Sequence, residues 1–223
     1  PSLRIEKRDL TTGEPVPETT FRIKGINVSY QNDVTTGAAG TATLEDLAPG
    51  VYEVTEIKVP SPWILDSTPK TVFLEATEGS DEPRVLTFEN SKQPGLLILK
   101  KDALSGEPVA GVTFHIKQID GTYEDYKTTD VNGQIFLENI EAGSYTVTET
   151  AVPGNYLLDS TPKTVELAPN KTATLEYFNL QRPGLLIQKV DKDGGPIEGI
   201  EFDVSRKGGD SLGTFITNAQ GEI

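Results

Sequence analysis

The sequence contains no cysteine and no methionine, and its 223 residues include one histidine and one tryptophan. Without cysteine the chain can form no disulfide, thiol nucleophile or thiolate metal site. The single histidine, His115, alternates outward from Phe114 on its predicted strand, so we expect it in solvent, and no convincing Ser–His–acid arrangement can be built from it. Because methionine is absent, we also expect Pro1 not to be a natural start and the chain to be part of a longer protein.

Positive charge is scarce as well, with 20 Lys and Arg against 34 Asp and Glu, a net charge of -14 and a pI of about 4.5. This balance argues against nucleic acid or an anionic membrane as a partner. No apolar run approaches the length of a membrane span, so we expect no membrane insertion in this fragment. Asp191 and Asp193 lack EF-hand spacing and are better explained by a turn. We expect neither a metal nor a cofactor.

Short strands joined by turns fit a composition with 21 glycines, 15 prolines and 35% hydrophobic residues. One stretch occurs twice, as YEVTEIKVPSPW in residues 52–63 and YTVTETAVPGNY in residues 145–156. Alternation along each strand brings a tyrosine, a valine and then a glutamate, Glu56 or Glu149, onto the inner face. A carboxylate on a core face is costly unless a partner pairs with it. The sequence therefore predicts a buried partner for each glutamate.

Three other strands each carry one lysine inward by the same alternation. SLRIEKRDL places Lys7 behind Leu3 and Ile5, GLLILKKDAL places Lys100, and GLLIQKVDKDG places Lys189. The lysine-to-glutamate separation is 49 residues in both complete segments (56 − 7 and 149 − 100). A repeated DSTPKTV follows each glutamate strand, beginning at Asp66 and at Asp159. The sequence thus predicts two complete repeats and the beginning of a third.

An asparagine ends the last strand of each complete repeat. RVLTFEN places Asn90 on the face of Phe88, and ATLEYFN places Asn179 on the face of Tyr177. The glutamate-to-asparagine separation is 34 residues in the first repeat and 30 in the second (90 − 56 and 179 − 149). Extra residues in EATEGSDEPR, residues 75–84, account for the difference. Each repeat therefore points a lysine, a glutamate and an asparagine inward.

Two interpretations of these groups stand about even on spacing and facing alone. In one, a buried Lys–Glu ion pair is completed by the asparagine and stabilises the core weakly. In the other, burial favours the neutral amine, which attacks the asparagine side-chain carbonyl while the glutamate polarises it and transfers protons. The product is a Lys–Asn isopeptide bond, formed once within each repeat with loss of ammonia.

The stretch YTVTETAVPGNY resembles the E-box of Gram-positive pilins, commonly written YxLxETxAPxGY, and KKDALSGEPVAGVTFHI resembles the start of the collagen-adhesin B-type (CnaB, or SpaA-like prealbumin) domain. The resemblance covers essentially the whole chain. It implies tandem immunoglobulin-like, transthyretin-like β-sandwiches. By position it makes Glu56 and Glu149 catalytic and cross-links Lys7 to Asn90 and Lys100 to Asn179, with Lys189 in an incomplete third site. The first repeat departs from the motif at residues 57–59 and 61–63, while Glu56 keeps its place.

We predict CnaB-type domains over residues 1–91 and 92–181, and the N-terminal part of a third, truncated domain over residues 182–223. The predicted function is a structural stalk, without enzyme activity beyond the single internal reaction, in an extracellular, cell-wall-anchored surface protein or pilin of a Gram-positive bacterium. Neighbouring domains of the same surface protein are the expected partners. An alternative is that the repeats are adhesin modules that bind a host matrix protein directly. An enzyme acting on external substrates ranks third, because no open polar site is apparent.

Overall fold

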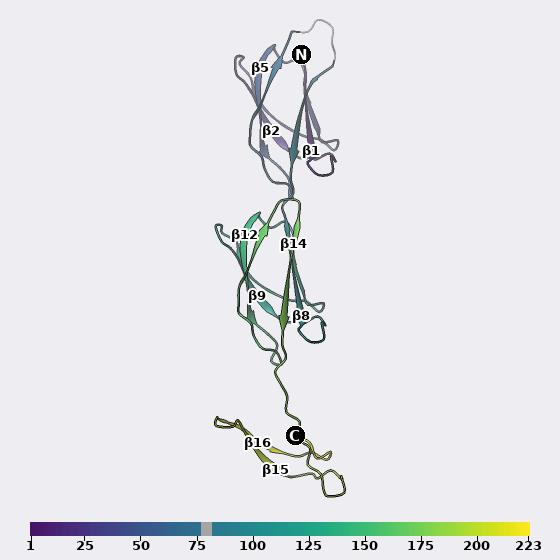
Figure 1. Ribbon diagram of the computed structural model, residues 1–223. Helices are drawn as coiled ribbons and strands as arrows, with labels where there is room; N and C mark the ends of the chain where they lie inside the picture. The colour runs from purple at the N-terminus through teal and green to yellow at the C-terminus, as the bar shows by residue number, and fades with distance from the viewer. Residues whose placement is uncertain (77–81) are drawn as a thin grey trace. The chain divides into compact units, whose positions relative to one another are not determined.

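A computed structural model of the chain describes residues 1–76 and 82–223. Every helix or strand assigned within those residues is a β-strand, which confirms the predicted all-β class. Two successive groups of seven strands follow the same plan (Figure 1), and we call them domain 1 (β1–β7) and domain 2 (β8–β14). Residues 182–223, called segment 3, follow them. Of the predicted insertion in residues 75–84, residues 77–81 lie outside the described residues.

The strands of domain 1 are β1 (Leu3–Asp9), β2 (Thr20–Gly25), β3 (Gln31–Thr35), β4 (Thr41–Leu44), β5 (Gly50–Lys58), β6 (Lys70–Leu74) and β7 (Arg84–Asn90). Those of domain 2 are β8 (Gly95–Asp102), β9 (Thr113–Gln118), β10 (Glu124–Thr128), β11 (Gln134–Leu137), β12 (Gly143–Ala151), β13 (Lys163–Leu167) and β14 (Thr172–Asn179). Segment 3 contains β15 (Glu201–Ser205) and β16 (Ser211–Ile216).

Each domain is a sandwich of a three-stranded and a four-stranded sheet. In domain 1 the strand orders are β4-β1-β7 and β3-β2-β5-β6, and in domain 2 they are β11-β8-β14 and β10-β9-β12-β13. The first and last strands of a domain are parallel neighbours, β1 with β7 and β8 with β14. This arrangement confirms the predicted tandem β-sandwiches. It also puts the predicted lysine and asparagine strands side by side.

The inward faces follow the alternation of the sequence. Along β1 the buried residues alternate with partly exposed ones, and β5 and β12 show the same period. Each domain has its own buried apolar cluster, one drawn from residues 3–88 and the other from residues 96–177. Such a two-layer core is the ordinary way in which sheets bury their apolar faces. The polar triads lie among these side chains.

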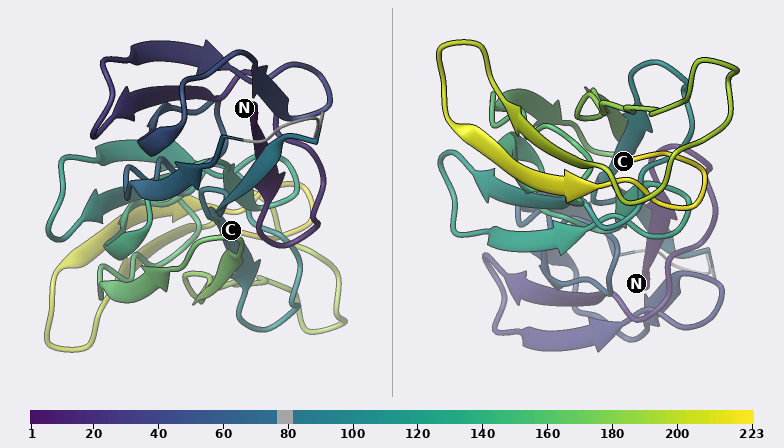
Figure 2. Two further views of the ribbon diagram at one scale, coloured as in Figure 1. Left: turned by 90° about the horizontal axis from the view of Figure 1, so that it is seen from above. Right: turned by 90° about the horizontal axis from the view of Figure 1, so that it is seen from below.

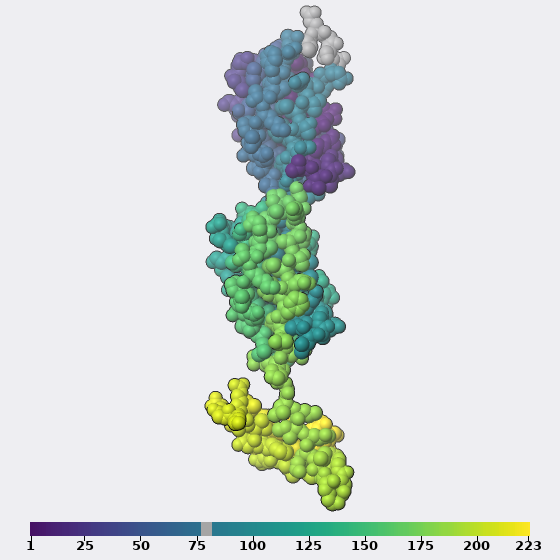
Figure 3. Space-filling model, in the orientation of Figure 1, coloured from purple at the N-terminus to yellow at the C-terminus, as the bar shows by residue number. Residues whose placement is uncertain are grey.

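Segment 3 is less complete than either domain. The chain divides by its contacts into one unit over Pro1–Leu180 and another over Gln181–Ile223. The strands of the β15–β16 hairpin run side by side (Figure 2), and segment 3 is visibly thinner than either domain in the space-filling view (Figure 3). Leu185 is 69% exposed, although it lines an apolar hollow together with Ile187 and Phe215, so the expected inward face of this segment is covered only in part. The physical reason is that residues 184–191 form only isolated bridges, to Glu222 and Pro196, and lack the two flanking strands that cover β1 and β8.

No helix among the described residues has the length and hydrophobicity needed to cross a membrane.

Candidate functional site: a buried Lys–Glu–Asn triad in each domain

The lysines enter the core from β1 and β8, where a turn fixes their backbone. The N–H of Lys7 donates to Gly40 O at 2.7 Å, and that of Lys100 donates to Gly133 O at 2.8 Å. Both glycines have positive φ, 68° and 66°. A Cβ on Gly40 would lie 2.6 Å from Lys7 O, and one on Gly133 would lie 2.5 Å from Lys100 O. Only glycine fits so close to the lysine carbonyl, which explains the glycine in each of these turns.

The glutamates enter from the opposite sheet, on β5 and β12. Glu56 and Glu149 are both fully buried, as is the tyrosine and valine pair that precedes each of them on the same face. In the register of the sheet, Glu56 lies opposite Phe21 and Glu149 opposite Phe114. The prediction that each glutamate follows an aromatic and a valine into the core is therefore confirmed.

The asparagines are the last residues of β7 and β14. Asn90 is 4% exposed and Asn179 is 3% exposed. Because each last strand lies parallel to the lysine strand, Asn90 pairs in register with Asp9, two residues after Lys7. A lysine from one strand and an asparagine from its neighbour thus face the same glutamate across the sandwich.

The glutamate carboxylate lies between the other two groups in both domains. In domain 1, Lys7 Nζ is 3.4 Å from Glu56 Oε2, while Asn90 Nδ2 donates to Glu56 Oε1 at 2.5 Å. In domain 2, Lys100 Nζ is 3.7 Å from Glu149 Oε2, and Asn179 Nδ2 donates to Glu149 Oε1 at 2.6 Å. One carboxylate oxygen therefore faces the amine and the other faces the amide nitrogen.

The amine and the oxygen that faces it make no hydrogen bond. Among the described residues, Lys7 Nζ and Glu56 Oε2 have no hydrogen-bond partner, and the same holds for Lys100 Nζ and Glu149 Oε2. A buried polar atom left unpaired costs about 1–3 kcal/mol, and more if it is charged. Four such atoms at equivalent positions in two domains are therefore unexpected for a site whose role is to stabilise the core through an ion pair.

Burial governs the protonation of the lysines. It lowers the pKa of Lys7 below its ordinary value of 10.5, whereas the charges of Glu56 and Asp66 act in the opposite direction and that of Lys70 adds to the lowering. The pKa of Lys100 is likewise lowered by burial, against Glu149 and Asp159 and together with Lys163. In both cores burial therefore shifts the lysine toward the neutral amine, which is the nucleophilic form.

Asp66 and Asp159, two acidic residues to which the sequence assigned no role, also reach the triads. The backbone N–H of Asp66 donates to Glu56 Oε1 at 3.2 Å, and that of Asp159 donates to Glu149 Oε1 at 3.1 Å. Each lies ten residues after its glutamate (66 − 56 and 159 − 149) and begins the repeated DSTPKTV. That identical spacing was the available signal.

A second acidic pair, Asp9 and Asp102, anchors the aromatic residue that follows each glutamate strand. Trp63 Nε1 donates to Asp9 Oδ2 at 3.1 Å, and Tyr156 Oη donates to Asp102 Oδ2 at 3.1 Å. Lys92 Nζ also lies 3.1 Å from Asp9 Oδ2. Each aromatic residue is thus tied to the end of the lysine strand by a hydrogen bond that the sequence did not indicate.

The other sequence candidates lie apart from the triads. His115 Nε2 is 2.8 Å from Glu124 Oε1, and its ring stacks on Tyr126 at the surface. Asp191 Oδ1 accepts the backbone N–H groups of Asp193 and Gly195, as a turn residue does. Lys189 is partly exposed, and Nζ donates to Val190 O at 3.4 Å. Within residues 1–76 and 82–223 no cluster of three or more potential metal ligands is found.

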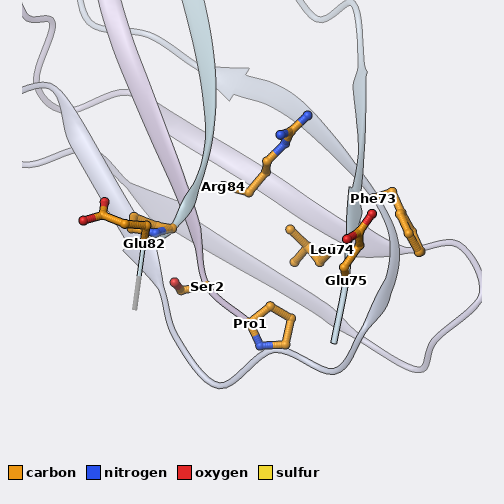
Figure 4. A pocket seen from close by; sticks show the side chains of 8 residues that line it. Pro1, Ser2, Phe73, Leu74, Glu75, Glu82 and Arg84 are labelled. Carbon is orange, nitrogen blue, oxygen red and sulfur yellow. The ribbon is translucent and has the colours of Figure 1, made fainter. Parts of the chain in front are cut away.

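A cavity of about 410 Å³ lies at the edge of domain 1 (Figure 4). Figure 4 shows that its lining comes from the start of the chain, the end of β6 and the start of β7: Pro1, Ser2, Phe73, Leu74, Glu75, Glu82, Pro83 and Arg84. The three triad residues of domain 1 do not line it. The cavity therefore has no part in the site described above.

Known proteins share this architecture. A mutant form of the shaft pilin SpaA from Lactobacillus rhamnosus GG has a TM-score of 0.52 and 14% identity, over 82% of this chain and 98% of that chain. The Bacillus anthracis TIE protein is 27% identical with a TM-score of 0.45, and all of this chain covers 42% of it. A streptococcal ancillary pilin is 18% identical with a TM-score of 0.44, over 82% of this chain and 62% of that chain. No curated protein sequence gives a significant match.

The chain thus spans less than half of the TIE protein and under two thirds of the ancillary pilin. The likeness to the shaft pilin supports the fold alone. A family model is more specific, because it matches twice, over residues 1–87 and residues 95–181, and so covers most of the chain. The chain belongs to the SpaA family of prealbumin-like fold domains.

Proposed function

We propose that the chain is a structural stalk of a Gram-positive pilin or surface protein, and that each complete domain forms an intramolecular Lys–Asn isopeptide bond promoted by its buried glutamate. The bonds join Lys7 to Asn90 and Lys100 to Asn179. The observation that carries the proposal is the pair of amines, which are fully buried and make no hydrogen bond to any residue that the structure describes, beside a carboxylate that also contacts an asparagine. Amide formation removes the cost of a buried amine without a hydrogen bond and leaves an N–H that can donate to the free glutamate oxygen.

The reaction needs no external reagent. The neutral lysine Nζ attacks the asparagine Cγ, the Nζ–Cγ bond forms, and the Cγ–Nδ2 bond breaks. One amine proton passes through the glutamate to Nδ2, which leaves as ammonia. Glu56 faces Lys7 with one oxygen and Asn90 with the other, which suits a group that takes a proton from one nitrogen and gives it to the other. Buried, fixed reactants supply the proximity.

The strand order gives the bond a mechanical use. Because β1 and β7 are parallel neighbours, tension between the two ends of the domain would pull these strands past each other. A covalent link from Lys7 to Asn90 carries that load directly from the first strand to the last. The intervening strands are then spared, and the sheets need not separate. This supports a stalk that bears force outside the cell.

We further propose domain bounds of 1–91, 92–181 and 182–223, with Lys189 in the incomplete third site. The similarity to shaft and ancillary pilins supports neighbouring subunits of the same polymer as partners and an extracellular location. Cell-wall anchoring belongs to the same proposal. Direct binding of a host matrix protein stays a prediction, since no observed feature favours it.

Intact mass under denaturing conditions tests the chemistry. We expect the purified chain to be lighter than its sequence mass by two ammonia molecules. Glu56→Ala and Glu149→Ala should each restore one of them, and Glu56→Gln and Glu149→Gln are matched variants that keep the side-chain size. A full sequence mass in the unmodified chain would refute the isopeptide proposal and leave buried ion pairs.

A further inference from the structure

One backbone N–H group in each domain fixes the orientation of the triad glutamate. It belongs to Asp66 in domain 1 and to Asp159 in domain 2, and each donates to the glutamate Oε1 that already accepts the asparagine Nδ2. Oε1 therefore has two N–H donors in both domains. Oε2 has no hydrogen-bond donor among the described residues and faces the lysine. The two oxygens of one carboxylate are thus distinguished by their surroundings.

A local turn holds this N–H group in place. Asp66 Oδ1 accepts the N–H of Thr68 at 3.0 Å, and Asp159 Oδ1 accepts the N–H of Thr161 at 3.0 Å. An aspartate that accepts the N–H two residues ahead forms an Asx-turn, which sets the direction of its own peptide group. The side chains of both aspartates are exposed, so the turn is built at the surface while the N–H points inward. The aspartate side chain acts on the glutamate through the backbone.

The distinction between the oxygens decides where a proton can reside. An oxygen with two N–H donors directed at it has no room for an O–H of its own, because the hydrogens would point at one another. A proton taken from the lysine must therefore bind Oε2, which is the oxygen that lies beside Nζ. Oε1 remains an acceptor beside the asparagine nitrogen while the amine attacks, and the proton held on Oε2 passes to Nδ2 later, as the Cγ–Nδ2 bond breaks. If the carboxyl group could rotate freely, it would also adopt orientations in which neither oxygen faces the amine.

We propose that Asp66 and Asp159 are positioning residues for isopeptide formation, which fix the carboxyl orientation of Glu56 and Glu149 by an Asx-turn that directs one backbone N–H at Oε1. The inference rests on the proposed function, since it assigns a role within that reaction. The inference is supported by the recurrence of the same two hydrogen bonds in both domains. They recur although the segment between glutamate and aspartate has a different sequence in domain 1 (residues 57–65) and in domain 2 (residues 150–158).

The experiment follows domain 2 while domain 1 of the same molecule acts as the internal control. The whole chain is made by cell-free synthesis as Asp159→Ala, as Asp159→Asn, and with an ester in place of the peptide bond between residues 158 and 159, which replaces that N–H by an oxygen and keeps every side chain. Samples are quenched in denaturant at intervals, and ammonia loss in each domain is read from peptide masses. Parallel samples are treated with protease before quenching, so that folded chains without the domain 2 bond are counted separately.

We expect the ester and Asp159→Ala to accumulate folded domain 2 that lacks the bond and to form the bond about tenfold more slowly, the kinetic equivalent of one lost hydrogen bond. Asparagine keeps the Asx-turn acceptor, so Asp159→Asn should form the bond at a rate close to that of the unmodified chain. Domain 1 should react normally in all three.

Two results would overturn the inference. If the ester variant contains no more folded, unbonded domain 2 than the unmodified chain, the N–H does not act on the reaction. If Asp159→Asn is as slow as Asp159→Ala, the side chain does not act through the turn. Both results leave the proposed function intact as long as the unmodified chain loses two ammonia molecules. Loss of none in the unmodified chain would instead refute the proposed function itself.

Discussion

Domains 1 and 2 differ in sequence directly after the triad glutamate, yet their triads are nearly the same. Residues 57–63 read IKVPSPW in domain 1, whereas residues 150–156 read TAVPGNY in domain 2. The lysine-to-glutamate distances are 3.4 and 3.7 Å, and the asparagine-to-glutamate distances are 2.5 and 2.6 Å. The departures of the first repeat from the motif therefore do not disturb its triad. The positions of these groups are set by alternation along the strands and by strand register. They do not depend on the residues that follow the glutamate.

The two domains also differ in the aromatic residue that ends the motif. Trp63 and Tyr156 belong to different residue types, but each donates one hydrogen bond to the same aspartate position, Asp9 or Asp102. What the site needs is a flat side chain with a donor at its edge, and both residues provide it. Substitutions that keep this chemistry are therefore compatible with the site.

Segment 3 shows which part of the site forms locally. The N–H of Lys189 donates to Gly221 O at 2.7 Å, as the other two lysines do with their glycines, and a Cβ on Gly221 would lie 2.4 Å from Lys189 O. The lysine side chain is nevertheless partly exposed. The turn that holds the lysine backbone thus forms from nearby residues, whereas burial of the amine requires the glutamate and asparagine strands.

The largest expected effect is the loss of stability of a single domain when its proposed isopeptide bond is removed. Asn90→Ala and Asn179→Ala each remove one proposed bond while keeping the Lys–Glu pair. A bond that closes a loop of about 80 residues contributes about 4 kcal/mol to the free energy of unfolding by the loop-entropy model. We expect each variant to destabilise its own domain by about that amount. Denaturant unfolding followed by circular dichroism measures both domains.

The single tryptophan, Trp63, makes this comparison specific because it reports on domain 1 alone. Its fluorescence transition should shift in Asn90→Ala and stay in place in Asn179→Ala. Equal shifts in both variants would mean that the domains unfold as one cooperative unit. No shift in either would contradict a covalent contribution to stability.

A smaller effect is expected from a hydrogen bond that only domain 2 has. Tyr177 Oη donates to Val147 O at 2.7 Å, and Phe88 occupies the equivalent place in domain 1. The aromatic pairs are otherwise alike, with ring centroids 4.8 Å apart for Phe21 with Phe88 and for Phe114 with Tyr177. We expect Tyr177→Phe to lower the free energy of unfolding of domain 2 by about 1 kcal/mol.

Tyr177→Phe should leave ammonia loss unchanged, because domain 1 has its triad with phenylalanine at this position. Thermal unfolding combined with intact mass checks both statements on the same sample. If domain 2 of this variant failed to form its bond, the hydroxyl group would have a part in the reaction. The two domains would then form their bonds by different mechanisms.

Much of the site could be predicted from sequence because it depends on alternation. Period-two patterning placed Lys7, Glu56 and Asn90 on inner faces without knowledge of the strand order. The hydrogen bonds from the Asp66 backbone and from Trp63 could not be predicted in the same way, because they depend on the path of the loop after β5. The partial exposure of the inward face of segment 3 could not be predicted either, because alternation indicates a face but cannot supply the strands that cover it.

A weaker effect is expected from Lys92 at low pH. Burial raises the pKa of Asp9, but hydrogen bonds from backbone N–H groups, Lys92 and Trp63 outweigh it and hold the pKa well below the ordinary value of 3.8. This depressed pKa stabilises domain 1 above about pH 4, and the contribution is lost as the pH falls through the folded-state value. Lys92→Ala removes a half-exposed partner, so we expect a loss below about 1 kcal/mol.

In acid titrations followed by Trp63 fluorescence, Lys92→Ala should unfold domain 1 at a slightly higher pH than the unmodified chain. Circular dichroism reports on both domains, and the transition that Trp63 does not report, that of domain 2, should stay at the same pH. An unchanged acid transition of domain 1 would mean that the backbone donors alone hold Asp9 ionised.

The last effect can be observed only in alkali. Burial, with smaller contributions from Glu141 and Tyr123, raises the pKa of Tyr145 from 10.0 to about 12. The unfolded chain loses this proton near pH 10 and the folded chain near pH 12, so the neutral phenol stabilises domain 2 below pH 10 and that contribution is lost as the pH rises through this window. Ultraviolet titration should show fewer phenolates at pH 11 in the folded chain than in denaturant, and Tyr145→Phe should reduce that difference. If the variant gave the same difference as the unmodified chain, Tyr145 would ionise like an exposed tyrosine, and the alkaline limit of domain 2 would have to come from other groups.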